Sequence, residues 1–401
     1  MNKPNAPILI IGAGLGGLTA ALALLRRGFD VEIYEQSGRL GEVGAGVQIG
    51  PNGTKVLIDL GIERELSKVA FRPTAKIIRI WNTGETFPAL DLSGRDATKF
   101  GAPYLTLHRA DLYNALLAGV RNEKPDAIHL GFRCASIAQD GKGVTAFFEN
   151  GEKATGAALI GADGVHSSVR ASLFGPDRPT YTGLMSWRGV IPMERLPESL
   201  HQPVGVNWVG PNGHVVHYPL RGGEIMNVNA VVEHEKWEVE SWTMAGTTEE
   251  CLNDFKGWHE EVHALMRAID RPLKWAFLYR KPLDKWAVGR ATLLGDACHS
   301  MVPFLAQGAS IAIEDGLVLA RAFQRYPQDI EQALKAYEAA RFERAYKVVR
   351  GSADNIQRFH NPALADPKTA VDYVRRSWGE RQVTGQSLDW IFSYDAATVP
   401  V

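Results

Sequence analysis

Hydrophobic and polar positions near the start of the chain follow two different periods in close succession. An apolar run at 7–11 has the length of a buried strand, and good helix formers at 18–27 follow it after a glycine-rich turn. Gly28 is a typical helix stop, and the apolar positions of 30–35 predict a second strand. The pattern therefore predicts a strand, a turn, a helix and a strand within one short unit.

Two further apolar strands that end in glycine turns occur at 158–164 and 291–297, and a helical pattern follows the second at 311–323. The segment between them is rich in Trp, Val, His and Gly, and it alternates in the manner of antiparallel strands. A charged helical pattern begins near 330, and the chain ends in an aromatic stretch. The nucleotide-binding elements are thus predicted to be split around a β-rich insertion.

Length and charge narrow the classes of partner. The chain has 401 residues, enough for two or three domain-sized units and a large core. Lys and Arg total 44 and Asp and Glu total 45, so the formal net charge is -1. This balance gives no general attraction for nucleic acid or an anionic membrane, and we expect neither as a partner.

The cysteine usage and the lack of a targeting pattern predict a cytoplasmic protein. The three cysteines are widely spaced and form no CxxC pair, which favours a reducing compartment. The sequence shows no signal-peptide pattern and no run of about 18 uninterrupted apolar residues. It also lacks HExxH and clustered-carboxylate patterns, so no metal is expected.

The strongest chemical signal is the turn between the first strand and helix. Gly12, Gly14 and Gly17 form a GxGxxG motif, in which the glycines permit a tight turn, close approach of a pyrophosphate and close helix–strand packing. Glu35 stands at the end of the second strand, where a carboxylate accepts hydrogen bonds from ribose hydroxyls and disfavours the 2′-phosphate of NADP. This context predicts a dinucleotide site.

Two later strand ends carry weaker signals. Asp163 lies in a GADG turn, and Asp296 follows the third strand in a GDA turn. Gly308 and Ala309 then precede a helix, where free N–H groups and the helix dipole favour an anionic ring. Each of these turns could equally be an ordinary connection of an α/β protein.

Taken in order, GAGLGG, GADGVHSSVR and GRATLLGDACHSMVPFLAQGASIAIED closely resemble the three fingerprints of the single-component FAD-dependent aromatic hydroxylases, the para-hydroxybenzoate hydroxylase group. The resemblance runs over nearly the whole chain. The stretches at 41–53, 107–112, 214–224 and the closing DWIFSYDA are similar to the branch that contains salicylate 1-hydroxylase, 3-hydroxybenzoate 6-hydroxylase and 6-hydroxynicotinate 3-monooxygenase.

The resemblance implies an α/β fold with a Rossmann-type, GR2-like FAD-binding domain, an inserted β-rich substrate domain and a helical C-terminal region. The FAD-binding domain is expected to comprise 1–75, 105–178 and 279–345. The substrate domain is expected to comprise 76–104 and the β-sheet segment 179–278, and 346–401 form a C-terminal helical tail. Relatives are often dimers, so a homodimer is one expectation.

The resemblance also implies that the Rossmann site holds FAD tightly, with NADH as co-substrate and NADPH as the alternative donor. Gly12, Gly14, Leu15, Gly16 and Gly17 would surround the pyrophosphate, and Glu35, Gln36 and Cys134 would lie near the adenosine, Cys134 through its backbone. Further implied cofactor residues, around the ribityl chain and the flavin ring, are Gln48, Arg109, Asp163, Asp296, Gly308, Ala309 and Ser310.

Candidates for the substrate site lie in the β-rich insertion. His214 and Tyr218 stand four residues apart, so they share one strand face, although a buried structural role would explain both equally well. The resemblance implies that His214, Tyr218 and Gln48 are the catalytic candidates that orient or deprotonate a phenol. His217 points to the opposite face and is expected to be structural.

The loop that precedes the helical pattern at 311–323 is expected to form another wall of the substrate site. Pro303 and Phe304 would make that wall apolar, where the hydroxybenzoate and hydroxynicotinate relatives carry Gln or His nearby, and this departure weakens both of those substrate assignments. His299 is expected to complete loop hydrogen bonds, and Cys298 lacks the adjacent base that a nucleophile requires.

The resemblance therefore implies an NADH- and O₂-dependent FAD monooxygenase that hydroxylates a small hydroxylated aromatic acid through a flavin C4a-hydroperoxide. Conversion of salicylate to catechol with loss of CO₂ is the leading expectation, and 3-hydroxybenzoate 6-hydroxylation or hydroxynicotinate oxidation is the alternative. An FAD-dependent oxidase or dehydrogenase without oxygen insertion, and a non-catalytic flavin-binding regulator, are the hypotheses from other classes.

Overall fold

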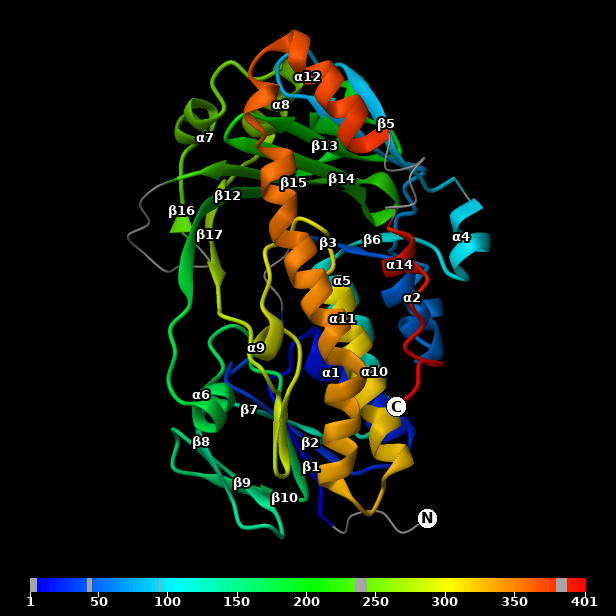
Figure 1. The fold of residues 1–401 in the computed structure, drawn as a ribbon, viewed down its shortest axis with the longest axis vertical. Helices are drawn as coiled ribbons and strands as arrows, with labels where there is room; N and C mark the ends of the chain where they lie inside the picture. Colours follow the sequence, from blue (N-terminus) through cyan, green and yellow to red (C-terminus); the bar gives the residue numbers. More distant parts are fainter. Residues whose placement is uncertain (1–5, 42–44, 94, 235–243, 380–387) are drawn as a thin grey trace.

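Two large β-sheets lie toward opposite ends of an elongated molecule in the computed structural model (Figure 1). The structure describes residues 6–41, 45–93, 95–234, 244–379 and 388–401. In these residues no helix is long and apolar enough to cross a membrane.

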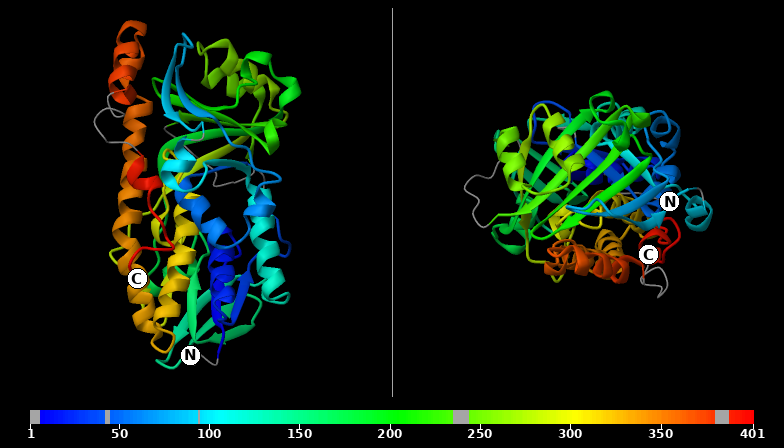
Figure 2. Two further views of the ribbon diagram at one scale, coloured as in Figure 1. Left: turned by 90° about the vertical axis from the view of Figure 1, so that its right-hand side faces the viewer. Right: turned by 90° about the horizontal axis from the view of Figure 1, so that it is seen from above.

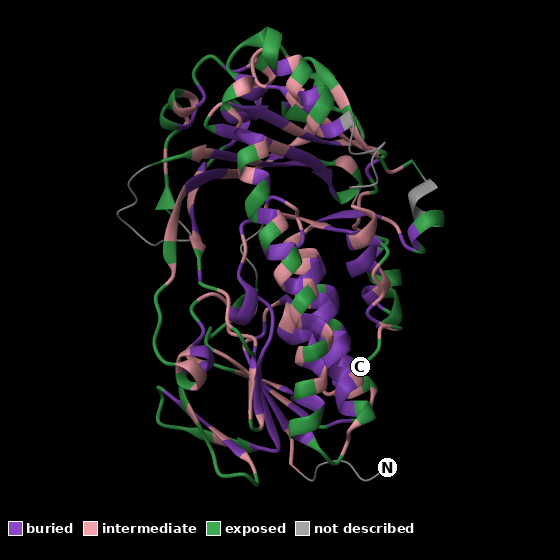
Figure 3. Cartoon of the chain, in the orientation of Figure 1, coloured by how far each residue is buried: buried purple, intermediate pink, exposed green. Residues whose placement is uncertain are grey.

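The six-stranded sheet at one end has the strand order β18-β19-β11-β1-β2-β7 and is parallel apart from β18. Its strands are β1 (Ile8–Ile11), β2 (Val31–Glu35), β7 (Ile128–Leu130), β11 (Ala158–Gly161), β18 (Ala287–Val288) and β19 (Ala291–Leu293). The apolar runs that predicted β1, β11 and β19 are buried in the sheet, as Figure 3 shows.

Three helices pack on this sheet, and the helical patterns at 18–27 and 311–323 predicted two of them. They are α1 (Leu15–Arg26), α5 (Arg109–Glu123) and α10 (Gly308–Arg325). Gly316 allows α10 to approach α1 closely, since a Cβ there would lie 2.7 Å from the backbone nitrogen of Ala20. The three-stranded sheet of β8 (Cys134–Gln139), β9 (Val144–Phe148) and β10 (Lys153–Gly156), together with α6 (Ser168–Phe174), completes this end.

The eight-stranded sheet at the other end has the order β16-β17-β12-β15-β14-β13-β4-β5. It is antiparallel except for the β13–β4 pair. Its strands are β4 (Ala75–Ile80), β5 (Thr86–Asp91), β12 (Thr180–Pro192), β13 (Val204–Gly210), β14 (Gly213–Leu220), β15 (Ile225–Glu233), β16 (Met244–Ala245) and β17 (Leu273–Tyr279).

The two faces of this sheet differ in chemistry. One face carries a buried apolar cluster that includes Trp187, Trp208 and Val228, and it packs against α7 (Thr248–Asp254) and α8 (Glu260–Ala268). The register places alternate residues, among them Arg188 and Tyr218, on the opposite face. This opposite face also carries apolar residues, among them Leu184, Val209 and Val231, and Figure 1 shows it turned toward the six-stranded sheet, away from α7 and α8.

The remaining elements join the two ends. β3 (Gly46–Ile49) pairs with β6 (Leu105–His108), and α2 (Pro51–Asp59), α3 (Glu63–Leu66) and α4 (Arg95–Phe100) lie along the same side. Short helices α9 (Asp296–His299), α12 (Pro367–Val374) and α14 (Asp389–Phe392) lie near the 30-residue helix α11 (Ile330–Phe359). Figure 2 shows α11 running along the long axis past both sheets.

Helix α11 is anchored by buried charges. Arg341 is fully buried and pairs with Glu314 and Asp315 of α10, each at 2.7 Å. Asp315 also bonds Nε2 of His299 at 2.6 Å, so His299 has the loop role expected of it. The boundary expected at 345/346 lies inside α11, because the apolar and paired positions continue through it without a helix stop.

Candidate active site

The glycine turn after β1 has the two kinds of space that a dinucleotide site requires. Gly12 has φ of +104°, and a Cβ on Gly17 would lie 2.1 Å from the Gly12 carbonyl oxygen, so both positions serve close packing. A Cβ on Gly14, in contrast, would meet nothing within 4 Å. Gly14 is also the N-cap of α1 and gives no side-chain cap, so the first N–H groups of the helix are available to an anion.

Glu35 ties the turn to the end of β2. Its Oε2 accepts a hydrogen bond from the Ala13 N–H and its Oε1 accepts one from the Ser37 N–H, both at 2.9 Å. Each carboxylate oxygen can accept a second bond, so the arrangement leaves room for ribose hydroxyls. Gln36 beside it is exposed.

Leu15 and Gly16 differ from the open Gly14. The Leu15 side chain is buried in the core, and a Cβ on Gly16 would lie 2.6 Å from Leu294. Their side-chain positions therefore serve packing, and any contact with the pyrophosphate would come from their backbone.

Asp163 makes its hydrogen bonds within the protein. Its carboxylate accepts bonds from the hydroxyl of Ser167 at 2.5 Å and from the backbone N–H groups of Ser168 and Val169 at 2.8 and 3.2 Å. Burial raises its pKa, and these bonds oppose the shift. The structure thus gives Asp163 a structural role at the start of α6, which the sequence did not reveal. Cys134 lies close by, and burial raises the pKa of its thiol to about 11, so the thiol is protonated.

Asp296 is the exposed residue in a run of buried neighbours after β19. Surrounding protein raises the pKa of its carboxyl, while the positive charges of His299 and Arg109 oppose that shift. Arg109, which interacts electrostatically with Asp296, begins α5, and its backbone N–H donates to the Ala45 carbonyl at 2.9 Å.

Gly308, Ala309 and Ser310 form the first turn of α10. A Cβ on Gly308 would meet nothing within 4 Å, and the N-cap Gln307 offers no side-chain cap. The Ser310 hydroxyl is buried without a hydrogen-bond partner among the described residues. Free N–H groups and open space therefore coincide here, which fits the polar edge of a flavin ring. The open space at Gly14 and Gly308 and the accessible carboxylate of Asp296 are together compatible with bound FAD.

Tyr218 lies in a polar cluster on the eight-stranded sheet. A Cβ on Gly46 would lie 2.7 Å from its ring, and Asn227 of the neighbouring strand β15 pairs with Tyr218 and accepts a bond from the Gly46 N–H at 2.7 Å. Gln48 bonds the Tyr218 hydroxyl and accepts a bond from the Tyr104 hydroxyl at 2.8 Å. Burial raises the pKa of Tyr218, so its phenol is neutral and acts as a hydrogen-bond donor or acceptor.

His214 shares the face of β14 with Tyr218 but meets different neighbours. Its ring contacts Phe304 and Phe359 with centroids 4.9 and 5.0 Å away, and its Nδ1 lies 2.7 Å from Nε2 of His360. Burial and His360 lower the pKa of His214 well below its usual value, so the imidazole is neutral. Phe304 is buried and forms an aromatic wall; Pro303, next to it, is half-buried.

His217 and Cys298 are structural. His217 accepts a bond from Trp208 at 3.2 Å on the opposite face, and burial lowers its pKa to about 3. Burial raises the pKa of the Cys298 thiol. In the described residues no group of three or more His, Cys, Asp or Glu side chains is arranged to hold a metal ion.

Two further cations, Arg188 and Lys76, lie on the sheet face of Tyr218, and no local pattern in the sequence marks them. The Arg188 guanidinium stacks 3.6 Å from the centroid of Trp275, its Nε is buried without a hydrogen bond, and it makes no ion pair with a described carboxylate. Lys76 lies 4.6 Å from the centroid of Tyr104, and burial lowers its pKa to about 8. A Cβ on Gly205 would lie 3.7 Å from Lys76 and 4.0 Å from Tyr218. Because glycine has no side chain, nothing at this position separates Lys76 from Tyr218.

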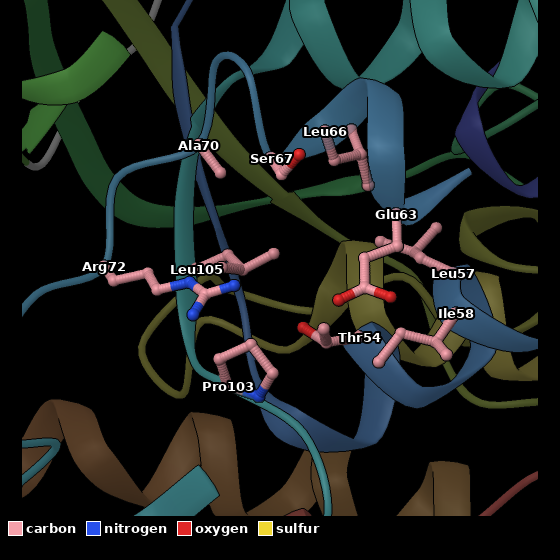
Figure 4. Close-up of a pocket in the computed structure, with 10 residues that line it drawn as sticks. All are labelled: Thr54, Leu57, Ile58, Glu63, Leu66, Ser67, Ala70, Arg72, Pro103 and Leu105. Atoms are coloured by element: carbon pink, nitrogen blue, oxygen red, sulfur yellow. The ribbon is translucent and has the colours of Figure 1, made fainter. Parts of the chain in front are cut away.

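A separate pocket opens beside α2 and α3 (Figure 4). Figure 4 shows Thr54, Glu63 and Arg72 pointing toward its middle. It contains none of the predicted site residues. The predicted site residues lie elsewhere, around the glycine turns and on the Tyr218 face of the eight-stranded sheet.

The fold and the relatives of the chain are those of an FAD-dependent aromatic monooxygenase, which is an oxidoreductase. Residues 5–352 match the family described as "FAD binding domain", and the chain belongs to that family. FAD is thus the cofactor of this family, as the resemblance implied.

Relatives of this chain act on small ring acids. It is 35% identical over 402 residues to 3-amino-4-hydroxybenzoate 2-monooxygenase PtmB3 of Streptomyces platensis, covering 99% of this chain and 98% of the relative. It is 37% identical to 3-hydroxybenzoate 6-hydroxylase of Polaromonas naphthalenivorans (90% and 89% covered) and 36% identical to 6-hydroxynicotinate 3-monooxygenase of Pseudomonas fluorescens (98% and 96% covered).

Solved structures agree with this fold. An HpxO structure from Klebsiella pneumoniae complexed with FAD is 28% identical, with a TM-score of 0.82 over 97% of this chain and 99% of that one. A salicylate hydroxylase substrate complex is 25% identical, with a TM-score of 0.81 over 98% of this chain and 96% of that one. Salicylate itself is not singled out, and the alternative substrates of the sequence analysis fit the relatives better.

Proposed function

We propose that this protein hydroxylates the ring of a small hydroxylated aromatic acid of the hydroxybenzoate or hydroxynicotinate type, with NADH as electron donor. The observation that carries the proposal is Arg188. Arg188 is half-buried with its Nε inaccessible, it lies on the sheet face of Tyr218 close enough that each group shifts the pKa of the other, and no described carboxylate pairs with it. A partly buried cation without a counter-ion favours an anionic ligand.

Arg188 would bind the carboxylate of the substrate, and Lys76, four strands away on the same sheet face beyond Tyr218, would add positive charge to the site. Burial lowers the pKa of Arg188 to about 10 and that of Lys76 to about 8, so both are protonated at neutral pH. The Trp275 ring under Arg188 holds the planar guanidinium in one orientation, which suits a planar carboxylate.

The substrate hydroxyl would lie toward Tyr218 and His214. Tyr218, held by Gln48, donates a hydrogen bond that stabilises negative charge on the phenolic oxygen. His214 is neutral and can accept the phenolic proton. Phe304 closes the site beside His214 and excludes water.

FAD, when bound, supplies the electron transfer from the nicotinamide and the activation of O₂. The chain contributes the substrate orientation, and the first turn of α10 contributes N–H groups toward the negative charge of the flavin ring. NADH is proposed over NADPH because the sequence offers no clustered basic residues for a 2′-phosphate. Equal kcat/KM values with both donors would contradict this choice.

A substrate panel tests the proposal. Purified FAD-loaded protein would receive NADH with 3-hydroxybenzoate, salicylate, 3-amino-4-hydroxybenzoate and 6-hydroxynicotinate, and with the phenol that lacks the carboxylate as a matched control. We expect a hydroxylated product from at least one acid and, from the control, a KM raised by roughly 10-fold or more, as for the loss of one charged hydrogen bond. Product identification separates simple hydroxylation from loss of CO₂.

Two results would contradict the proposal. If phenol reacts as well as every acid, the Arg188 assignment is wrong. If NADH is oxidised and only H₂O₂ appears with all acids, the protein lacks hydroxylase activity toward this class and the oxidase alternative gains support.

A further inference from the structure

We propose that His214, His360 and Glu233 form a proton relay that connects the substrate site with solvent. This inference rests on the proposed function, since it assigns the route by which the proton of the substrate hydroxyl leaves.

The three side chains form one hydrogen-bonded line. Nδ1 of His214 lies 2.7 Å from Nε2 of His360, and Nδ1 of His360 lies 2.9 Å from Oε1 of Glu233. They come from three elements: the strand β14, the end of helix α11 and the end of strand β15. Such residues are adjacent only because α11 crosses the end of the sheet.

Burial changes steeply along this line. His214 is 1% exposed and His360 is 6% exposed, whereas the side chain of Glu233 is 47% exposed. Phe304 and Phe359 cover His214, with ring centroids within about 5 Å. Bulk water therefore reaches Glu233 but not His214.

The chemistry of Glu233 fixes the tautomers. A carboxylate only accepts hydrogen bonds, so Nδ1 of His360 must donate to it. In the neutral ring, Nε2 of His360 then carries the lone pair and accepts from Nδ1–H of His214. The Nε2 atom of His214 is left with a lone pair, which is the state required to accept a proton from a phenol.

Few charges act on this line among the described residues. His360 acts on His214, and Glu233 acts on His360. Both imidazoles are neutral because burial lowers their pKa values. A neutral pair can pass a proton without holding a buried charge.

The O–H bond of the substrate breaks and its proton joins Nε2 of His214, while Nδ1–H of His214 gives its proton to Nε2 of His360. Nδ1–H of His360 gives its proton to Glu233 and then to water, and the electron pair remains on the substrate oxygen. The reverse transfer, when the product oxygen is reprotonated, restores both tautomers, and no oxidant is consumed.

In this relay His360 and Glu233 act through His214 and touch neither the substrate nor the flavin. Their test therefore needs a readout other than turnover. FAD-loaded oxidised enzyme would be mixed with 3-hydroxybenzoate in weak buffer containing a pH-indicator dye. The rate of proton release and the phenolate absorbance would be recorded, and substrate affinity would come from the flavin spectrum. The variants are His360→Leu and Glu233→Gln, and Asp354→Asn on the exposed side of α11 is the matched control.

We expect both relay variants to release the proton at least about tenfold more slowly than wild type. Their affinity for 3-hydroxybenzoate should change less than the release rate, and the control should match wild type. A small permeant buffer should restore part of the rate in Glu233→Gln. Wild-type release rates in both folded, FAD-loaded variants would overturn the relay.

A second measurement does not depend on the substrate. In ¹⁵N-histidine-labelled enzyme, nitrogen chemical shifts should show His214 and His360 both protonated at Nδ1, with assignments from His214→Gln and from His360→Leu. The opposite tautomer at either ring would overturn the relay even if hydroxylation is confirmed. If the tautomers are as expected but no acid perturbs the flavin spectrum, the proposed function fails, and the substrate role of the relay fails with it.

Discussion

His214 and Tyr218 lie on one face of β14, yet each contacts a different wall of the site. The Tyr218 ring lies against Gly46 and its hydroxyl bonds Gln48. The His214 ring lies against Phe304 and bonds His360. Four residues of extended strand span about 13 Å, so a ring bound along the sheet could reach both side chains.

Removing the Tyr218 hydroxyl should uncouple the reaction. Tyr218→Phe keeps the ring against Gly46 but removes the donor to the substrate oxygen. We expect the hydroxylation rate to fall by roughly 10²-fold, with flavin reduction affected less. The ratio of product to NADH consumed measures this, and an unchanged ratio with lower thermal stability would assign Tyr218 to packing alone.

Replacing Arg188 should weaken the binding of acids selectively. Arg188→Met removes the charge over Trp275, and we expect the Kd for 3-hydroxybenzoate to rise by roughly 10- to 100-fold. Arg188→Lys should recover only part of the affinity, because an ammonium lacks the planar fork that stacks on Trp275. Titration of the flavin absorbance gives each Kd, and phenol serves as the uncharged control ligand. Equal losses for phenol and the acid would argue for a general distortion.

Lys76 predicts a pH dependence of substrate binding. Its pKa of about 8 means that its charge is lost as pH rises through 8, so the affinity for an anionic acid should fall over that range by roughly tenfold. Since the unfolded pKa is 10.5, the unfolded chain binds more protons between pH 8 and 10.5, and stability should rise with pH there. Lys76→Met should remove both effects. A wild-type pH profile in that variant would exclude Lys76 from the site.

Two glycines of the same motif should respond differently to alanine. A Cβ at position 14 enters open space, so Gly14→Ala should fold normally but lose FAD affinity, as the pyrophosphate can no longer approach. A Cβ at position 17 would lie 2.1 Å from a carbonyl oxygen, so Gly17→Ala should destabilise the fold by about 1–3 kcal/mol. Thermal unfolding and FAD content measured on both apoproteins separate the effects. FAD binding unchanged in Gly14→Ala would place the pyrophosphate elsewhere.

Local sequence determined the FAD-binding part of this protein. The buried strands, the glycine turn and Glu35 are read from neighbours within one strand–helix–strand unit, because the glycine motif and the helical pattern that follows it identify the short apolar runs as strands. The shared strand face of His214 and Tyr218 follows from the two-residue period of a strand and was likewise predictable.

Only the tertiary structure decided the partners of these residues. Arg188, Lys76 and His360 lie on β12, β4 and α11, and nothing in their local sequence distinguishes a polar residue facing solvent from one facing a buried site. Asp163 likewise resembles a cofactor ligand in sequence, but the start of α6 takes up its carboxylate. The physical reason is that strand register and the crossing of α11 over the sheet bring distant residues together, and those long-range contacts leave no short-range pattern in the chain.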